Sequence, residues 1–85
     1  ALSPKQRALT RQALGFPNAR NKSYRNRFLA SYRAGDYDHW LRLVDEGLAD
    51  HGPIIKGLVR FWLTREGAEA ALEAGETLCN EDFPA

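Results

Sequence analysis

Hydrophobic residues recur along the chain at spacings that predict helices at both ends and in the middle, with a short β-hairpin between the last two. In PKQRALTRQAL, residues 4–14, apolar side chains fall on one side of a helix. Ser3 precedes this helix as a typical N-cap, and Gly15 follows it where a left-handed C-cap is expected. Residues 17–23 are expected to form a loop.

A second amphipathic helix is predicted in DYDHWLRLVDEG, residues 36–47. Its apolar positions recur at helical spacing at Tyr37, Trp40, Leu41 and Val44. Asp36 is a plausible N-cap, Gly47 is expected to end the helix, and Leu48 continues the apolar face.

Two extended stretches around a turn are predicted in LADHGPIIKGLVRFWLT, residues 48–64. His51-Gly52-Pro53 and Lys56-Gly57 are the two candidate interruptions, and LVRFWLT is rich in residues that strands favour. Because Phe61 and Trp62 are adjacent in a strand, they point to opposite faces, and one of them is expected to be exposed. The earlier stretch YRNRFLASYR fits a helix or a strand, and we favour an extended segment at 27–30.

Thr64 is expected to cap a last helix, REGAEAALEAG, that runs to a stop at Gly75. The predicted fold class is therefore mainly α with a small β-hairpin (α+β), in one domain over residues 1–77. The acidic tail 78–85 is expected to fray unless Leu78 and Phe83 dock on the domain.

The second half of the chain resembles a winged-helix domain, in which a core helix ends in a leucine–glycine turn before a two-stranded wing and a further helix. The residues that match this pattern are Leu43, Gly47, Leu48, Leu63, Thr64, Gly67, Ala71 and Leu72. The resemblance implies a winged-helix-like fold and says little about function.

The whole chain also resembles small uncharacterised phage and prophage proteins that share a "YRN.F" segment and a "DY..W..LV..GLA" helix. The matching residues are Tyr24, Arg25, Asn26, Phe28, Asp36, Tyr37, Trp40, Leu43, Val44, Gly47, Leu48 and Ala49. This resemblance carries no settled activity.

Charge is distributed unevenly along the 85 residues, although the net charge is only +1. Residues 1–35 hold eight Lys and Arg and no Asp or Glu, whereas all eleven acidic residues follow position 35. Such segregation gives a dipolar molecule unless the fold mixes the two halves, and it suggests contact with a polyanion.

The stretch NARNKSYRNR, residues 18–27, concentrates this basic character. Its Lys and Arg side chains could neutralise phosphates, and its asparagines could bind nucleobases or the nucleic-acid backbone. Tyr24 could stack on a nucleobase. The alternative is a solvated loop with Tyr24 in the core. Together with two bases that flank the expected wing turn, the candidate nucleic-acid contacts are Arg20, Lys22, Arg25, Asn26, Arg27, Lys56 and Arg60.

The helix at 37–46 is a poor candidate for reading a DNA groove. Its solvent side is expected to carry Asp38, His39, Arg42, Asp45 and Glu46. DNA phosphates favour a neutral or basic face, so contact with nucleic acid is expected from the basic first half and the wing.

Two functions from different classes remain open. The first is a nucleic-acid-binding regulator or accessory protein, with duplex DNA as the expected ligand. The second is a protein-interaction module, such as a host-takeover inhibitor or a phage assembly factor, in which the winged helix is only a scaffold. A homodimer is a further option.

Other classes find little support in the sequence. His39, His51 and Cys79 are too scattered for a zinc site, and no nucleophile, phosphate-loop or dinucleotide motif occurs. We expect no catalytic activity, no cofactor and no small-molecule substrate. No apolar run approaches a membrane span of roughly 20 residues and no leader opens the chain, so a cytoplasmic protein is expected.

Overall fold

The computed structural model describes residues 2–84, which fold into an α+β unit with three helices and a three-stranded antiparallel sheet. The elements follow one another as α1 (Pro4–Leu14), β1 (Phe28–Ser31), α2 (Tyr37–Asp45), β2 (Ala49–Ile55), β3 (Leu58–Leu63) and α3 (Arg65–Ala71). In the sheet, β3 lies between β1 and β2.

The predicted boundaries of α1 are confirmed. The Ser3 hydroxyl accepts a hydrogen bond from the Gln6 backbone N–H, and the Gln6 side chain accepts one from the Ser3 N–H, so the two residues form a capping box. Gly15 ends the helix in the left-handed conformation, with φ of 93°.

Both ends of α2 agree with the prediction. Asp36 is the N-cap residue, although its side chain makes no capping hydrogen bond and its carboxylate lies 3.2 Å from Lys5 Nζ. Gly47 adopts φ of 78°, and the Leu48 N–H donates to the Leu43 carbonyl, as in a Schellman motif.

The sheet resolves both ambiguities of the sequence. The segment after Arg27 is extended, and β1 pairs with β3 so that Phe28 lies opposite Phe61. Of the two candidate interruptions in the hairpin, Lys56-Gly57 is the turn, with φ of 52° and 76°. The Gly52-Pro53 pair instead lies within β2, where the register shifts between His51 and Ile54.

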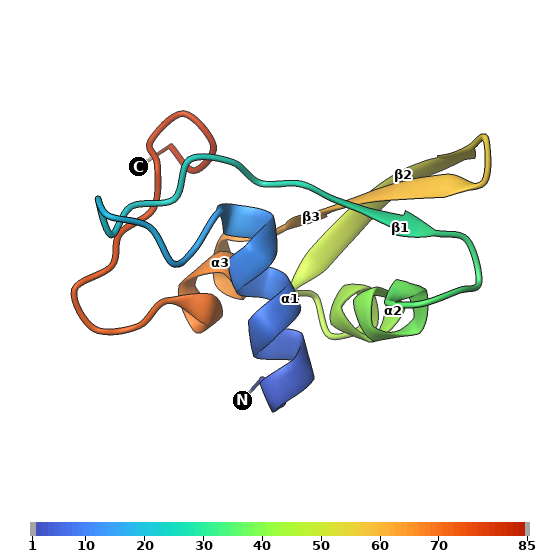
Figure 1. Cartoon of the computed structure of the whole chain (residues 1–85), viewed down its shortest axis with the longest axis horizontal. Helices are drawn as coiled ribbons and strands as arrows, with labels where there is room; N and C mark the ends of the chain where they lie inside the picture. Colours follow the sequence, from blue (N-terminus) through green and yellow to red (C-terminus); the bar gives the residue numbers. More distant parts are fainter. Residues whose placement is uncertain (1, 85) are drawn as a thin grey trace.

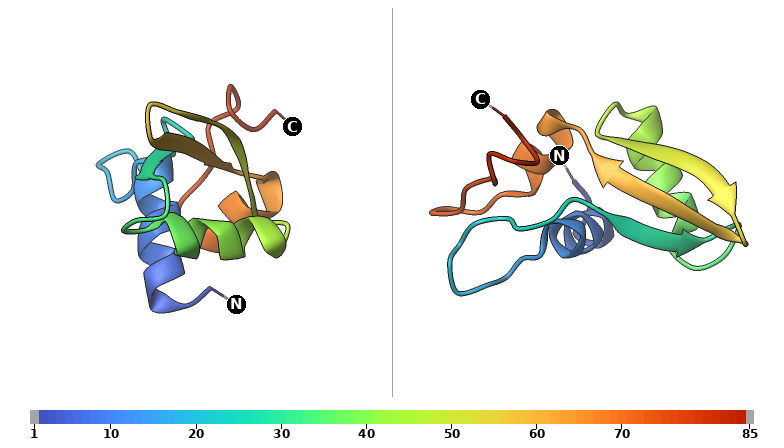
Figure 2. Two further views of the ribbon diagram at one scale, coloured as in Figure 1. Left: turned by 90° about the vertical axis from the view of Figure 1, so that its right-hand side faces the viewer. Right: turned by 90° about the horizontal axis from the view of Figure 1, so that it is seen from above.

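The sheet has one covered face and one open face. Figures 1 and 2 show α1 and α2 on the same side of the sheet, whereas the opposite side carries no helix among the described residues. On the covered face, Phe61 is fully buried and stacks on Trp40 with ring centroids 5.4 Å apart. We call the other side the open face; Trp62 lies on it and is half-buried, as the alternation of side chains predicted.

The helix α3 is shorter than predicted, because it ends at Ala71 and not at Gly75. The Arg11 guanidinium donates to the Ala71 carbonyl over 3.0 Å and to both carboxylate oxygens of Glu76 over 2.6 and 2.8 Å. Leu72 is extended, so the helix stops there, and Arg11 binds both the last residue of α3 and the segment that follows it.

The tail takes the docked form of the two that the sequence left open. Phe83 is buried in the core, and Leu78 packs against it. The Cys79 N–H donates to the Ser23 hydroxyl over 2.7 Å, which joins the tail to the loop after α1. The folded unit therefore includes the tail up to Pro84.

Candidate nucleic-acid interface

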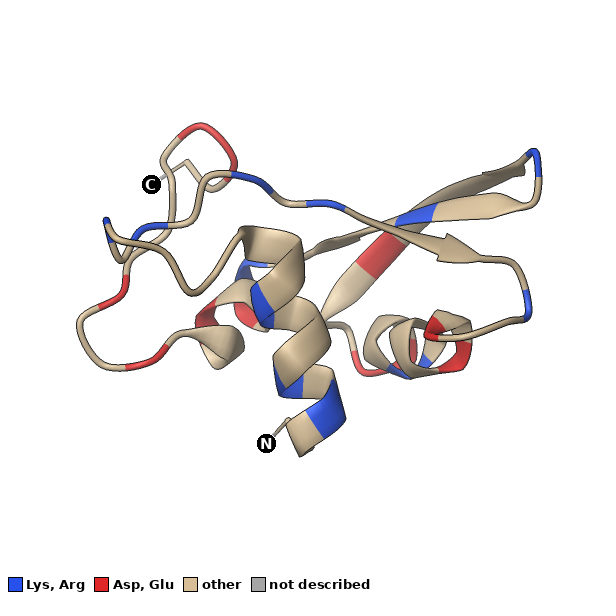
Figure 3. Cartoon of the chain, viewed as in Figure 1, with Lys and Arg blue, Asp and Glu red and all other residues tan. Residues whose placement is uncertain are grey.

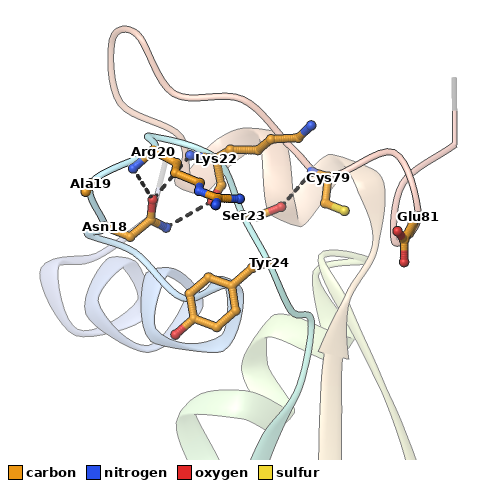
Figure 4. Close-up of a pocket in the computed structure, with 8 residues that line it drawn as sticks. All are labelled: Asn18, Ala19, Arg20, Lys22, Ser23, Tyr24, Cys79 and Glu81. Carbon is orange, nitrogen blue, oxygen red and sulfur yellow. Dashed lines mark hydrogen bonds between the residues drawn. The ribbon is translucent and has the colours of Figure 1, made fainter.

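Asn18 organises the loop that begins the basic stretch. Its side-chain oxygen accepts hydrogen bonds from the N–H groups of Arg20 and Lys22, and its side-chain nitrogen donates to the carbonyls of Gly15 and Lys22 (Figure 4). Asn18 is thus committed to loop geometry, as its tendency to form turns suggests. Arg20 and Lys22 remain exposed.

Arg20 and Lys22 line a hollow of about 540 Å³ whose far wall is formed by the tail (Figure 4). Cys79 and Glu81 contribute to that wall, so a carboxylate faces the same space as the two bases. The other predicted contacts line different hollows, one of which adjoins this hollow at Tyr24. The structure therefore divides the predicted site into two groups.

Arg25 is partly used by the fold. Its Nε and Nη2 donate to the Gln12 carbonyl over 3.2 and 2.6 Å, next to the C-terminus of α1, where a positive charge is favourable. Its guanidinium also lies 5.4 Å from the ring centroid of Tyr24. Tyr24 itself is 62% exposed, with its ring against Gly15, so it is outside the core.

Asn26 has a structural role. Its side-chain oxygen accepts from the Leu63 N–H over 2.8 Å, and its side-chain nitrogen donates to the Leu63 carbonyl over 3.0 Å. The amide thereby extends the pairing of β3 beyond the end of β1. Both ends of the side chain are engaged within the protein, and we leave Asn26 out of the proposed contacts below.

Arg27, Lys56 and Arg60 meet on the open face. Leu29 pairs with Arg60 on that face, and Arg27 precedes β1 at the level of Trp62. Arg27, Arg60 and Trp62 line a hollow of about 400 Å³, and Lys56, Arg60 and Trp62 line a second one of about 540 Å³. Figure 3 shows Lys and Arg, in blue, on the segment that leads into β1, on β3 and at the β2–β3 turn. Within residues 2–84, no ion pair involves any of these three bases.

The second hollow also has an apolar lining that the sequence analysis missed. Leu29, Ile55 and Leu58 line it and are 56%, 62% and 42% exposed. Alternation along LVRFWL could have revealed this surface, because it places Leu58, Arg60 and Trp62 on the same side of the strand. The open face therefore combines apolar side chains with unpaired positive charge.

Two other basic residues of the N-terminal half have carboxylate partners from the second half of the chain. Lys5 pairs with Asp36, and Arg11 pairs with Glu73 and Glu76. The Arg11 hydrogen bonds lower the pKa of Glu76 to about 2 and raise the pKa of Arg11. Arg11 is engaged in a nearly buried ion pair that joins α1 to the segment after α3, whereas the Lys5–Asp36 pair is exposed to solvent and contributes little to stability.

The exposed side of α2 is acidic, as predicted. Asp38, Arg42, Asp45 and Glu46 are exposed, and His39 is half-buried beside them. The Gln6 side chain of α1 donates a hydrogen bond to Glu46 over 3.1 Å. Phosphates would meet three carboxylates and one guanidinium on this helix, which makes it the less favourable surface for nucleic acid.

No helix within residues 2–84 has the length and apolar character that crossing a membrane would require. Among the same residues, no group of three or more His, Cys, Asp and Glu side chains is placed to hold a metal ion. Comparison with known proteins gave no match to a family model, to a curated protein or to a solved structure.

Proposed function

We propose that this protein is a small nucleic-acid-binding regulator or accessory protein that contacts phosphates through the open face of its sheet. The observation that carries the proposal is the convergence of Arg27, Lys56 and Arg60 on that face with no ion pair among the described residues. Arg25 lies at the border of the same surface. Unpaired bases gathered on one surface are the usual electrostatic footprint of phosphate binding.

The proposal includes a winged-helix-like scaffold in which the wing, rather than the helix before it, makes the contacts. The succession of α2, the β2–β3 hairpin and α3 supports this assignment. The acidic exposed side of α2 supports the unusual mode of binding, since it would repel a phosphate backbone. The resemblance to small phage proteins supplies the expected biological setting.

The salt dependence of binding tests the proposal. If three or four phosphates are neutralised, the logarithm of the association constant should fall with the logarithm of the salt concentration. The expected slope is about −2 to −4, depending on whether the ligand is single- or double-stranded. Arg27→Ala and Arg60→Ala are each expected to reduce the magnitude of that slope by roughly 0.7 to 0.9. Fluorescence anisotropy with labelled DNA at several salt concentrations measures it.

Arg42→Ala provides a matched control, because it removes the same charge from the exposed side of α2. Its slope should equal that of the unmodified protein. Equal slopes for Arg27→Ala and Arg42→Ala would show that net charge alone governs binding, and the assignment to the open face would be wrong.

The apolar hollow favours a second candidate function, docking of a protein partner. Exposed apolar patches on small domains commonly mark interaction sites. The positive rim formed by Lys56 and Arg60 would suit a partner whose apolar residues are accompanied by carboxylates. Two copies packed through this face would place their positively charged Lys and Arg side chains against one another. The resulting repulsion argues against a homodimer through this face. Failure to bind any nucleic acid at low salt would favour this function.

A further inference from the structure

Trp62 occupies the central position on the open face, where the two hollows meet. It lines both of them, together with Arg60. Its neighbours in the strand, Phe61 and Leu63, are 0% and 2% exposed and belong to the core, whereas Trp62 does not. A large aromatic side chain has thus been placed outside the core at the junction of two hollows.

One edge of the Trp62 indole lies near Gly52 of the neighbouring strand. A Cβ atom added to Gly52 would come 3.8 Å from Cζ3 of the indole, which is ordinary contact distance. Gly52 belongs to β2, the strand next to Trp62, and Asp50 is the direct partner of Trp62 in that strand. The ring is therefore supported by β2 while it lines both hollows.

Charged groups surround this aromatic ring. Arg25, Arg27 and Arg60 share one hollow with Trp62, and the carboxylate of Asp82 lies on the rim of the same hollow. On the other side, Lys56 and Arg60 accompany Trp62 in the apolar hollow. This face therefore carries four basic side chains and two acidic ones, Asp50 and Asp82.

We infer that the open face takes single-stranded nucleic acid in preference to duplex, with one base stacked on Trp62 and phosphates at Arg27 and Arg60. This inference rests on the proposed function and adds the class of ligand. A duplex hides the flat faces of its bases and presents phosphates, whereas an unpaired strand offers both. Only the single strand offers both an apolar nucleobase to the Trp62 indole and phosphates to Arg27 and Arg60.

The apolar hollow strengthens the preference. Leu29, Ile55 and Leu58 would gain nothing from a phosphate backbone, but they can exclude water from the face or edge of a splayed base. Tyr24 is a weaker candidate for stacking, because its ring already lies against Gly15 and beneath Arg25. Trp62 is accordingly the main stacking residue.

The dimensions of the face indicate a short site. At a rise of about 3.3 Å per residue, the strand from Leu58 to Trp62 spans about 13 Å. The hollow beyond Trp62 extends this surface toward Tyr24. A surface of this size suits about four nucleotides, the short end of the range for small single-strand-binding folds.

The test compares a labelled oligothymidylate of about eight nucleotides with a hairpin duplex of similar length in low salt. The single strand should bind at least about tenfold more tightly than the duplex. Trp62→Ala should weaken single-strand binding by about 5- to 100-fold and leave duplex binding nearly unchanged. Tyr32→Ala removes an aromatic side chain outside both hollows and serves as the matched control.

Tryptophan fluorescence gives an independent readout. Trp40 is fully buried, so its emission should not respond to the oligonucleotide. Quenching on addition of the single strand is expected in the unmodified protein and should disappear in Trp62→Phe. Thermal unfolding of each variant, followed by circular dichroism, establishes that the fold is retained.

The outcomes separate this inference from the proposed function. Equal, salt-dependent binding of duplex and single strand, unaffected by Trp62→Ala, would preserve the proposed function and overturn the single-strand inference. Absence of binding to either ligand in low salt would overturn both and would assign the face to a protein partner.

Discussion

Replacing Glu76 by Gln removes the charge that joins α1 to the segment after α3. The Glu76 side chain is only 7% exposed and that of Arg11 only 12%, so water screens their interaction weakly. Two charge-assisted hydrogen bonds, of 2.6 and 2.8 Å, connect the groups. Each such bond contributes about 1.5–3 kcal/mol, and Gln keeps part of the geometry. We therefore expect a loss of about 2–3 kcal/mol in the free energy of unfolding near neutral pH.

The pKa of Glu76 gives a second route to this magnitude. In the folded protein the hydrogen bonds from Arg11 lower it to about 2, from an ordinary value of 4.5. At about 1.4 kcal/mol per pKa unit, the difference sets an upper limit of about 3 kcal/mol. Because the folded-state pKa is the lower one, the contribution is complete above pH 4.5 and is lost as the pH falls toward 2.

Urea denaturation of the unmodified protein and of Glu76→Gln, at several pH values between neutrality and about 2, measures both effects. The difference in stability should be largest near neutral pH and should shrink toward zero at the acid end. Glu69→Gln, which changes an exposed carboxylate on α3, should alter stability by less than about 0.5 kcal/mol. A Glu76→Gln difference that does not vary with pH would refute the reasoning.

Three other substitutions test the packing that supports the open face, each by its effect on the midpoint of urea or thermal unfolding. Gly67→Ala should destabilise by about 2 kcal/mol, although alanine normally favours helices, because its Cβ would lie 1.9 Å from the Leu48 carbonyl oxygen; an increase in stability would contradict this close approach. Asn26→Ala should cost about 2–3 kcal/mol through the two lost hydrogen bonds to Leu63, and a neutral result would show that these bonds are not formed. Phe83→Ala should cost about 3 kcal/mol, since the ring is 6% exposed; no loss would mean that the tail is not docked.

Local sequence signals predicted the parts of the fold that depend on local physics. The cap formed by Ser3, the stop at Gly15 and the cap formed by Thr64 are each decided by a few adjacent residues, and all three were predicted correctly. The placement of Phe61 and Trp62 on opposite faces followed from strand alternation alone, although Trp62 is half-buried rather than exposed.

The errors arose where a distant residue decides the local structure. At the end of α3, the Ala71 carbonyl and Glu76 bind Arg11, which lies 60 and 65 residues earlier in the chain. Asp36 occupies the predicted N-cap position of α2, but its side chain pairs with Lys5 of α1 and makes no capping hydrogen bond. No local pattern specifies such contacts, because tertiary pairing overrides the intrinsic preference of the segment.

The candidate site was predicted in part for the same reason. The sequence identified the candidate Lys and Arg residues. Only the register of β1 on β3 shows that Arg27 and Arg60 share a face with Trp62. The same geometry removes Asn26 from the set, since its amide is engaged with Leu63. Arg20 and Lys22 line a different hollow from Arg27 and Arg60, so they are not part of the open face.

The arrangement assigns separate tasks to bases that look equivalent in the sequence. Arg11 and Lys5 pair with carboxylates, and Arg25 binds the end of α1. Arg27 and Arg60, which have no ion pair within residues 2–84, remain for a ligand. On this account, binding affinity and stability should respond to different sets of arginine substitutions.

The most direct test of the central claim is a residue-resolved NMR titration of the labelled protein with a short oligonucleotide. The account predicts that the indole N–H signal of Trp62 and the amide signals of Arg27, Leu29 and Arg60 shift on binding, while the indole signal of Trp40 stays in place. Shifts concentrated on α2, over residues 37–45, would contradict the assignment of the open face as the nucleic-acid interface.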